Sequence, residues 1–410
     1  MNRHLNRRQL LQTAGCFTVA SLLPLGIQGW VARTKAQNPN PNRLIVLFLR
    51  GGVDGLSLVV PYRDIAYYQM RPTIALSAPG DQGNQDSVID LDGQFGLHPR
   101  LAPLMPLWQQ KSLAWVHAAG SPDPTRSHFD AQDYMESGTP GVKSTNDGWM
   151  NRLLEVLPQE SLIQAVNLGK TMPRILRGTE NVVSVPTGQP GLNHLLVDRR
   201  GIQTTFARLY SGTAAIDLAY QEGLQARKIL LAELEEERLM ASRGAGSAVD
   251  LATDARKLAQ LMRGDTRTQL AFMAIGGWDT HVNQTNLLNR YLQPLGEGLA
   301  TLVRELGDLY RKTTIVVLSE FGRTVAENGN QGTDHGRGTT IAVLGGQVQG
   351  GQVLGDWPGL EPSQLVERRY LPVTTDFRDV IGTILHRQLG LKPTQLAQVF
   401  PDYTVRELTL

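Results

Sequence analysis

Short apolar runs alternate along the chain with longer segments that have the periodicity of a helix. The first run, 44–49, is continuous and stops at Gly51 and Gly52, which is typical of a strand covered on both faces. Similar runs occur at 113–117, 163–166, 270–275, 315–318 and 341–344. Helical patterns lie between them at 99–110, 128–137, 149–157, 206–240, 249–262, 284–311 and 377–389. This alternation predicts an α/β domain with a mostly parallel sheet and right-handed crossovers.

Two other stretches set the organisation around that sheet. Residues 37–42 alternate Asn and Pro and predict a short tether, after which 43–410 form a single domain. Residues 226–238 are rich in Ala, Leu, Glu, Lys and Arg, all strong helix formers. We therefore expect a helical insertion or cap on the sheet over about 204–264.

The first 36 residues have the order of a signal peptide. Arg3, Arg7 and Arg8 precede a mildly apolar stretch at 10–27, and small residues come before Gln37. Residues 6–11 look like the twin-arginine signature. Polar residues dilute the apolar stretch, so it is a poor membrane span, although a retained anchor is the alternative. We expect export through the twin-arginine translocase to the periplasm or beyond, with no stable membrane span in the mature form.

Composition changes once residues 1–36 are set apart. They hold five basic residues and no acidic ones, so the formal charge falls from +2 for the whole chain to −3 for 37–410. This excludes bulk attraction to nucleic acid or to anionic lipid. Cys16 is the only cysteine and lies in the leader, which excludes a disulfide, a thiolate nucleophile and a cysteine metal site from the mature chain.

Carboxylates and histidines gather where the apolar runs end, the edge at which α/β sheets bind ligands. The candidates are Asp54, Asp279, His281, Glu320, Asp334 and His335. Carboxylate and imidazole together are the ligands of Zn²⁺, Mn²⁺ and similar ions. Asp279 and His281 are two residues apart, so in an extended segment both point to the same side. A lone Asp beside glycine is more often a turn residue, but clusters at four strand ends predict one or two metal ions.

One helix start after the 113–117 run carries further chemistry. Ser127 with Asp130 fits a capping box, which alone would explain both residues. Alternatively, Ser127 is a nucleophile, because a helix amino terminus and a nearby metal both favour its ionised form. Arg126 or His128 would then hold or protonate the oxyanion of the substrate. The two interpretations are compatible.

Five motifs, at 48–55, 126–130, 278–281, 319–323 and 333–336, together resemble one family. It is a large bacterial family of exported proteins, still labelled a domain of unknown function (fifteen-oh-one), that is grouped with the alkaline phosphatase and sulfatase superfamily. The resemblance covers nearly the whole mature chain. It implies a three-layer α/β/α sandwich with a metal site at the strand ends.

The resemblance also implies roles for single residues. Asp54 matches the metal-binding aspartate after the first strand, and Ser127 falls where the superfamily places its nucleophile. Glu320-Phe321 stands where the superfamily often has Asp-His, which leaves Asp334 and His335 to supply the missing ligands. That departure puts a two-zinc site in doubt and admits a single ion, or a carboxylate-rich site for Mn²⁺ or Ca²⁺.

Two functions are compatible with these residues. The first is an exported metal-dependent hydrolase of phosphate or sulfate esters, in which the six carboxylates and histidines hold the metal and Ser127 attacks the ester. Arg126, His128 or Arg323 would stabilise the charge that develops on its oxygens. The second is a non-catalytic exported module that binds metal or a cell-surface polyanion, since a fold does not assure catalysis.

Overall fold

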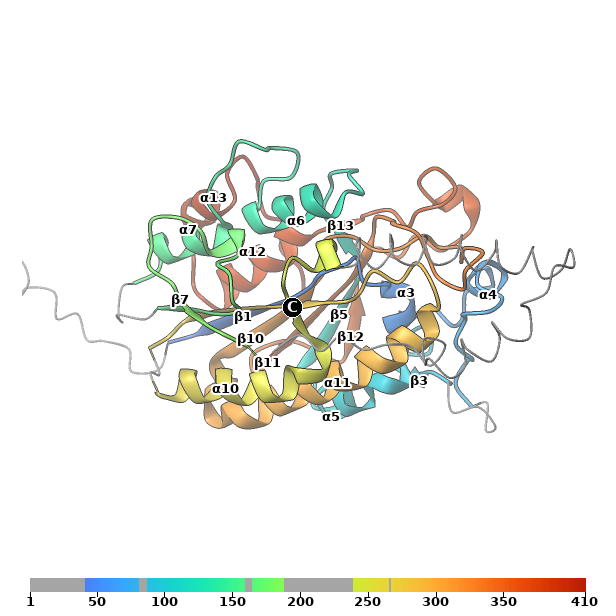
Figure 1. Cartoon of the computed structure of the whole chain (residues 1–410), viewed down its shortest axis with the longest axis horizontal. Coiled ribbons are helices and arrows are strands. Elements are labelled where there is room, and N and C mark those ends of the chain that lie inside the picture. Colours follow the sequence, from blue (N-terminus) through green and yellow to red (C-terminus); the bar gives the residue numbers. More distant parts are fainter. Residues whose placement is uncertain (1–40, 81–86, 159–163, 188–238, 265–266) are drawn as a thin grey trace, which may run out of the picture. The chain divides into compact units, whose positions relative to one another are not determined.

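Strand β1 (Arg43–Leu49) lies inside a ten-stranded sheet, whose main order is β12-β5-β11-β10-β1-β9-β6-β7. The computed structural model describes residues 41–80, 87–158, 164–187, 239–264 and 267–410 (Figure 1). Short strands β13 and β8 pair with β5 and β9. The other bounds are β5 Leu113–Gly120, β6 Ala165–Leu168, β7 Val183–Val185, β8 Gly246–Ser247, β9 Leu270–Gly276, β10 Thr313–Leu318, β11 Thr339–Gly345, β12 Gln352–Leu354 and β13 Thr375–Asp376.

Strand directions decide which loops meet. β1 is parallel to β10 and β9, and β6 is parallel to β9 and β7. Strand β11 alone runs antiparallel to both of its neighbours, β10 and β5, among the pairs of this sheet in the described chain. The mostly parallel sheet is therefore confirmed. The segment that precedes β11 lies at the same edge as the segments that follow β1, β5, β9 and β10.

The side chains of β1 point alternately to two apolar layers. Ile45, Leu47 and Leu49 belong to a core shared with helices α10 (Leu251–Gly264) and α11 (Gln284–Leu306). Leu44, Val46 and Phe48 belong to a core shared with α7 (Trp149–Val156), α12 (Phe377–Arg387) and α13 (Pro393–Val399). Helices cover both faces of the sheet (Figure 1). The three-layer α/β/α arrangement expected from the resemblance is thus present.

Most of the helical segments begin where the sequence predicted, with differences at prolines and glycines. The pattern at 99–110 is a 3₁₀ turn, Pro99–Leu104, followed by α5 (Met105–Gln109), because Pro103 and Pro106 remove donors from a continuous α-helix. The α-helical part of the 284–311 segment ends before Gly307, which has a φ of +55°. The other α-helices within the described residues are α3 Gly55–Leu58, α4 Ile65–Met70 and α6 His128–Ser137. A small sheet joins β2 (Val59–Val60), β4 (Gly96–Leu97) and β3 (Ile89–Asp90).

Several expectations fall outside the described residues. They are the signal at 1–36, most of the tether at 37–42 and the greater part of the insertion at 204–264. The described end of the predicted insertion contains α10, which packs against α11. None of the helices in the described ranges is both long enough and apolar enough to cross a membrane.

Truncation of a side chain in the central strand tests how much the stability depends on it. Leu47 is fully buried, and we expect Leu47→Ala to lower the free energy of unfolding by about 2–5 kcal/mol, because the lost contacts leave a cavity. Leu261→Ala is the matched control, since that side chain is 37% exposed, and should change stability by about 0.5 kcal/mol or less. Equal effects in urea denaturation would contradict the central position of β1.

Candidate metal centre

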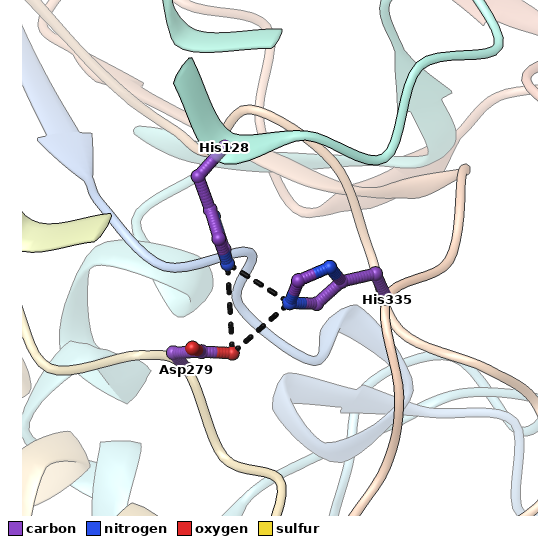
Figure 2. Close-up of side chains that lie close together, drawn as sticks. All are labelled: His128, Asp279 and His335. Atoms are coloured by element: carbon purple, nitrogen blue, oxygen red, sulfur yellow. Dashed lines mark hydrogen bonds and ion pairs between the residues drawn. The ribbon is translucent and has the colours of Figure 1, made fainter. Parts of the chain in front are cut away.

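Four side chains from three separate segments converge at the edge of the sheet. His128 is the first residue of α6, which follows β5, and Asp279 and His281 follow β9. His335 lies in the loop between β10 and β11. Figure 2 shows His128, Asp279 and His335 with their donor atoms facing one another. The sequence placed these residues at strand ends, and the antiparallel direction of β11 brings His335 to the same edge.

The spacing of the donor atoms suits a single small ion. The Nε2 atoms of His128 and His335 are 2.9 Å apart, and Asp279 Oδ1 lies 3.3 Å from His335 Nε2 and 3.6 Å from His128 Nε2. His281 Nε2 lies 3.0 Å from Asp279 Oδ1 and 3.0 Å from His335 Nε2. In a tetrahedral site with Zn–N bonds of ~2.0–2.1 Å, ligand atoms are about 3.3 Å apart. His128, Asp279 and His335 therefore form a group that could hold a divalent ion, and His281 lies beside two of its donor atoms.

The far side of each imidazole faces an oxygen atom. His128 Nδ1 lies 2.8 Å from Glu320 Oε1, His335 Nδ1 lies 2.9 Å from the carbonyl oxygen of Arg126, and His281 Nδ1 lies 3.4 Å from Asp334 Oδ1. A carbonyl oxygen only accepts, so Nδ1 of His335 carries the proton, and its Nε2 has a free lone pair when the ring is neutral. Outer oxygen acceptors of this kind orient the histidine ligands of metal sites.

Glu320 and Asp334 thus stand behind the histidines. Besides His128, Glu320 Oε1 accepts hydrogen bonds from the Gly51 amide at 2.8 Å and from Gln132 Nε2 at 2.9 Å. Asp334 accepts from Arg369 Nη2 at 2.8 Å and from Asn328 Nδ2 at 3.1 Å. The sequence analysis expected both carboxylates to bind metal directly, whereas the structure places them in contact with the imidazoles that face the centre.

The electrostatics of the centre favour a positive charge in the middle. Burial opposes ionisation of Asp279, but Arg323 and the three histidines hold the pKa of its carboxyl far below the ordinary range. Burial alone would lower the pKa of His128, yet hydrogen bonds to Asp279 and Glu320 raise it to about 9. Burial lowers the pKa of His335 despite the nearby Asp279 carboxylate. A proton and a metal ion would compete for the same place.

Arg323 is fully buried and faces the backbone. Its guanidinium donates to the carbonyl oxygens of Gly52 at 2.7 Å, Gly51 at 2.6 Å and Thr333 at 3.0 Å, and also to the Asp279 carboxylate. These contacts join the segments after β1, β9 and β10 to the segment before β11. The sequence analysis gave Arg323 a role in binding the oxyanion; the structure places its donors on the strand-end loops.

Asp54 lies in a different buried network. Its carboxylate accepts from Arg71 at 2.6 and 3.0 Å, from Ser57 at 2.6 Å and from Gln284 at 2.7 Å. Burial would raise the pKa of this carboxyl, but the Arg71 guanidinium brings it below the ordinary value. The structure therefore does not bring Asp54 into the group of side chains that face His335.

Ser127 and Arg126 are exposed and directly precede His128 in the chain. Ser127 occupies the N-cap position of α6, but its side chain makes no capping hydrogen bond, so the expected capping box is absent. The Arg126 guanidinium is 39% exposed and lies over the ring of Tyr370, 4.6 Å from its centroid. Arg369 packs against the same ring at 5.6 Å. Both guanidinium groups also pair with carboxylates, Arg126 with Glu367 at 3.6 Å and Arg369 with Asp334 at 2.8 Å.

Two glycines allow the loops to come this close. A Cβ atom on Gly51, which has a φ of +123°, would lie 2.5 Å from the Asp279 amide nitrogen. A Cβ atom on Gly332 would lie 2.2 Å from the carbonyl oxygen of His281. Both distances are far below van der Waals contact. Glycine is required because the backbones themselves meet at these two positions.

Sequence reasoning missed the position of His128 in the donor set and the roles of Gln132 and Phe321. Gln132 lies one helical turn after His128, so the i, i+4 spacing was a signal for a shared face. Phe321 packs against His128 and His335, with ring centroids 4.8 and 5.0 Å away. Phe321 thus places an aromatic ring at the position where the resembled superfamily often has a histidine ligand.

The fold and these residues define a class: an α/β/α protein with a candidate divalent-metal centre at the strand ends. The chain belongs to the family described as Protein of unknown function (DUF1501), whose model matches residues 96–400. This confirms the family that the motifs predicted. A search of curated proteins finds no match.

Several solved structures are similar to the chain at low identity. One is Ps i-CgsB in complex with k-i-k-neocarrahexaose, with 11% identity, a TM-score of 0.43, and coverage of 87% of this chain and 74% of that one. A protein in the alkaline phosphatase superfamily from Vibrio parahaemolyticus has 12% identity, a TM-score of 0.38 and coverages of 78% and 63%. The C-terminal periplasmic domain of EcEptC from Escherichia coli has 9% identity, a TM-score of 0.40 and coverages of 90% and 89%. At these values the chemistry must be judged from the residues of this chain.

Loss of one donor should weaken metal binding. We expect His335→Ala to reduce the affinity for Zn²⁺ or Mn²⁺ by more than the roughly 10–100-fold that loss of an outer hydrogen bond costs, because a ligand atom itself is removed. Isothermal titration calorimetry on chelator-treated protein measures this change. His386→Ala is the matched control, since His386 is half-buried on α12 and pairs with Glu407. Unchanged affinity in His335→Ala would rule out the centre described above.

Asp54 provides a test that separates stability from metal binding. We expect Asp54→Asn to destabilise the protein by about 3–5 kcal/mol, because it leaves the buried Arg71 guanidinium without its carboxylate. The metal content should not change. Asp308→Asn, which breaks an exposed pair with Arg311, should cost about 0–1 kcal/mol. Loss of metal from a folded Asp54→Asn protein would show that Asp54 acts at the centre after all.

Proposed function

We propose that the chain is a metal-dependent hydrolase of phosphate or sulfate esters. The observation that carries this proposal is the convergence of three imidazole Nε2 atoms on Asp279 Oδ1, each imidazole being held from behind by an oxygen atom. Ser127 stands next to the donor His128 at a helix amino terminus, with no capping bond to occupy its hydroxyl. Arg126 and Arg369 are partly exposed, and their guanidinium groups, which pair with Glu367 and Asp334, would offer donors to an anionic ester.

In the proposed reaction each group has a separate role. A bound divalent ion would polarise an oxygen of the ester and lower the pKa of a nearby hydroxyl. Ser127 Oγ forms a bond to phosphorus or sulfur and gives up its proton, while the bond to the leaving oxygen breaks and that oxygen takes up a proton. Water then hydrolyses the seryl ester and restores the hydroxyl. Arg126 and Arg369 would attract and orient the charged group, since both guanidinium groups reach solvent.

Residues 1–36 support a place for this activity outside the cytoplasm. Their arginine pair, diluted apolar stretch and small residues before Gln37 are those of a twin-arginine signal. The translocase of that route carries folded proteins, so a centre assembled from distant segments would form before export. We propose a periplasmic or extracellular site of action on this basis.

One observation favours the alternative, a non-catalytic metal-binding module. His128, His281, His335 and Asp279 would supply four protein ligands, and structural zinc sites are closed in this way, whereas catalytic sites keep one position open. An anionic partner on the cell surface would then be bound and not cleaved. We favour the hydrolase because Ser127, whose side chain makes no capping hydrogen bond, would have no role beside a closed structural site.

Replacement of Ser127 distinguishes the hydrolase from the non-catalytic metal-binding module. With Zn²⁺, Mn²⁺ or Ca²⁺ bound, we expect turnover of an aryl phosphate or aryl sulfate, and Ser127→Ala should lower kcat by about 10³-fold or more because it removes the attacking oxygen. Metal content, measured by elemental analysis, should stay the same.

Ser363→Ala, in an exposed turn, is the matched control and should retain full activity. Stoichiometric metal without turnover of either ester in the wild-type protein would favour the module. Full activity in Ser127→Ala would reject the serine mechanism.

A further inference from the structure

A cavity lies at the same edge of the sheet. Its volume is about 580 Å³, within the range of ~300–1,000 Å³ typical of small-ligand pockets. Asn167 and Leu168 of β6 and Phe272 and Ala274 of β9 contribute to its wall, together with residues 169–174. None of the four metal-facing residues lines it, so it is a separate cavity.

The lining of this pocket is strongly cationic. It contains six basic side chains and two acidic ones: Arg50, Lys143, Lys170, Arg174, Arg177 and Arg243, against Asp133 and Glu136. A concave wall of one charge concentrates the field inside it and attracts ligands of the opposite charge. This positive charge is local, because residues 37–410 as a whole have a formal charge of −3.

Carboxylates pair with four of these six cations, one of which is Lys143, paired with Asp130 at 2.9 Å. Asp133 is shared by Arg174 and Arg243, each at 2.8 Å, and Glu136 pairs with the buried Arg50 at 2.6 Å. Lys170 and Arg177 are exposed, and within the described ranges neither forms an ion pair. Their charges reach solvent at the pocket and would be available to an oxyanion.

A chain of buried hydrogen bonds links the pocket to the metal centre. Arg50, in the pocket wall, donates to the side-chain oxygen of Gln132. Gln132 Nε2 donates to Glu320 Oε1 at 2.9 Å, and that same oxygen faces His128 Nδ1 at 2.8 Å. The wall of the pocket is therefore only a few side chains from a metal-facing histidine.

We propose that this pocket is a second anion-binding site, which takes a phosphate or sulfate group of a ligand that carries more than one. Its size admits a group larger than a bare ion, such as a phosphorylated or sulfated sugar unit. The surplus of guanidinium and ammonium groups suits oxyanions, which accept several charge-assisted hydrogen bonds at once. The proposal rests on the charge and shape of the pocket and needs no turnover at the metal centre.

The test uses chelator-treated full-length protein, with inorganic tripolyphosphate and inorganic sulfate as the probes in isothermal titration calorimetry. We expect binding without metal, and at least a tenfold weaker affinity in the double variant Lys170→Gln, Arg177→Gln. The matched control is Arg304→Gln, Arg311→Gln, which removes two exposed charges outside the pocket and should bind as the wild type does. The probe that binds more tightly indicates the phosphate or the sulfate source.

Three results would overturn the proposal. They are no binding of either probe by the wild type, equal weakening in the control variant, or weakening by His335→Ala but not by the pocket variant, which would place the anion at the metal centre. Thermal unfolding of each variant excludes a loss of fold. Ser127→Ala should bind both probes normally, so a failure of the hydrolase proposal and a failure of this one give different patterns.

Discussion

The candidate metal centre depends on the hydrogen bonds that the buried guanidinium of Arg323 donates. It donates to carbonyl oxygens of Gly51, Gly52 and Thr333 and to the Asp279 carboxylate, so it joins four strand-end segments. A fully buried cation is tolerated only when its donors are satisfied, and here backbone oxygens satisfy most of them. The residue also fixes the oxygen of Asp279 on which three imidazoles converge. The geometry of the centre is thus a consequence of how Arg323 is held.

Much of the fold could be predicted because the buried strands consist of continuous runs of apolar residues. Runs such as 44–49 and 270–275 correspond to β1 and β9, and helical periodicity located α6, α7 and α12. The direction of β11 could not be predicted, since an apolar run does not reveal whether its strand is parallel or antiparallel to its neighbours. That direction decides whether Asp334 and His335 reach the edge where Asp279 lies, so the convergence itself was beyond the pattern.

The candidate site, like the fold, could be predicted from the sequence only in part. Residue type and place made Asp279, His281 and His335 candidates, and the structure brings their side chains together. Asp54 has the same type and position, yet its carboxylate meets Arg71, which no local pattern links to it. Glu320 was expected to face a metal and instead holds His128 from behind. Contacts between distant segments separate a ligand from a residue that orients one, and one sequence does not contain them.

The three histidines and Asp279 come from segments that are far apart along the chain, and the described residues contain no cysteine. An ion held by all four would act as a cross-link. It would tie the start of α6, the segment after β9 and the loop before β11 to one point, and so remove conformational freedom from the unfolded chain. Because only the folded chain presents these donors together, the free energy of ion binding would add to the free energy of folding. The metal concentration would then set part of the free energy of unfolding of this protein.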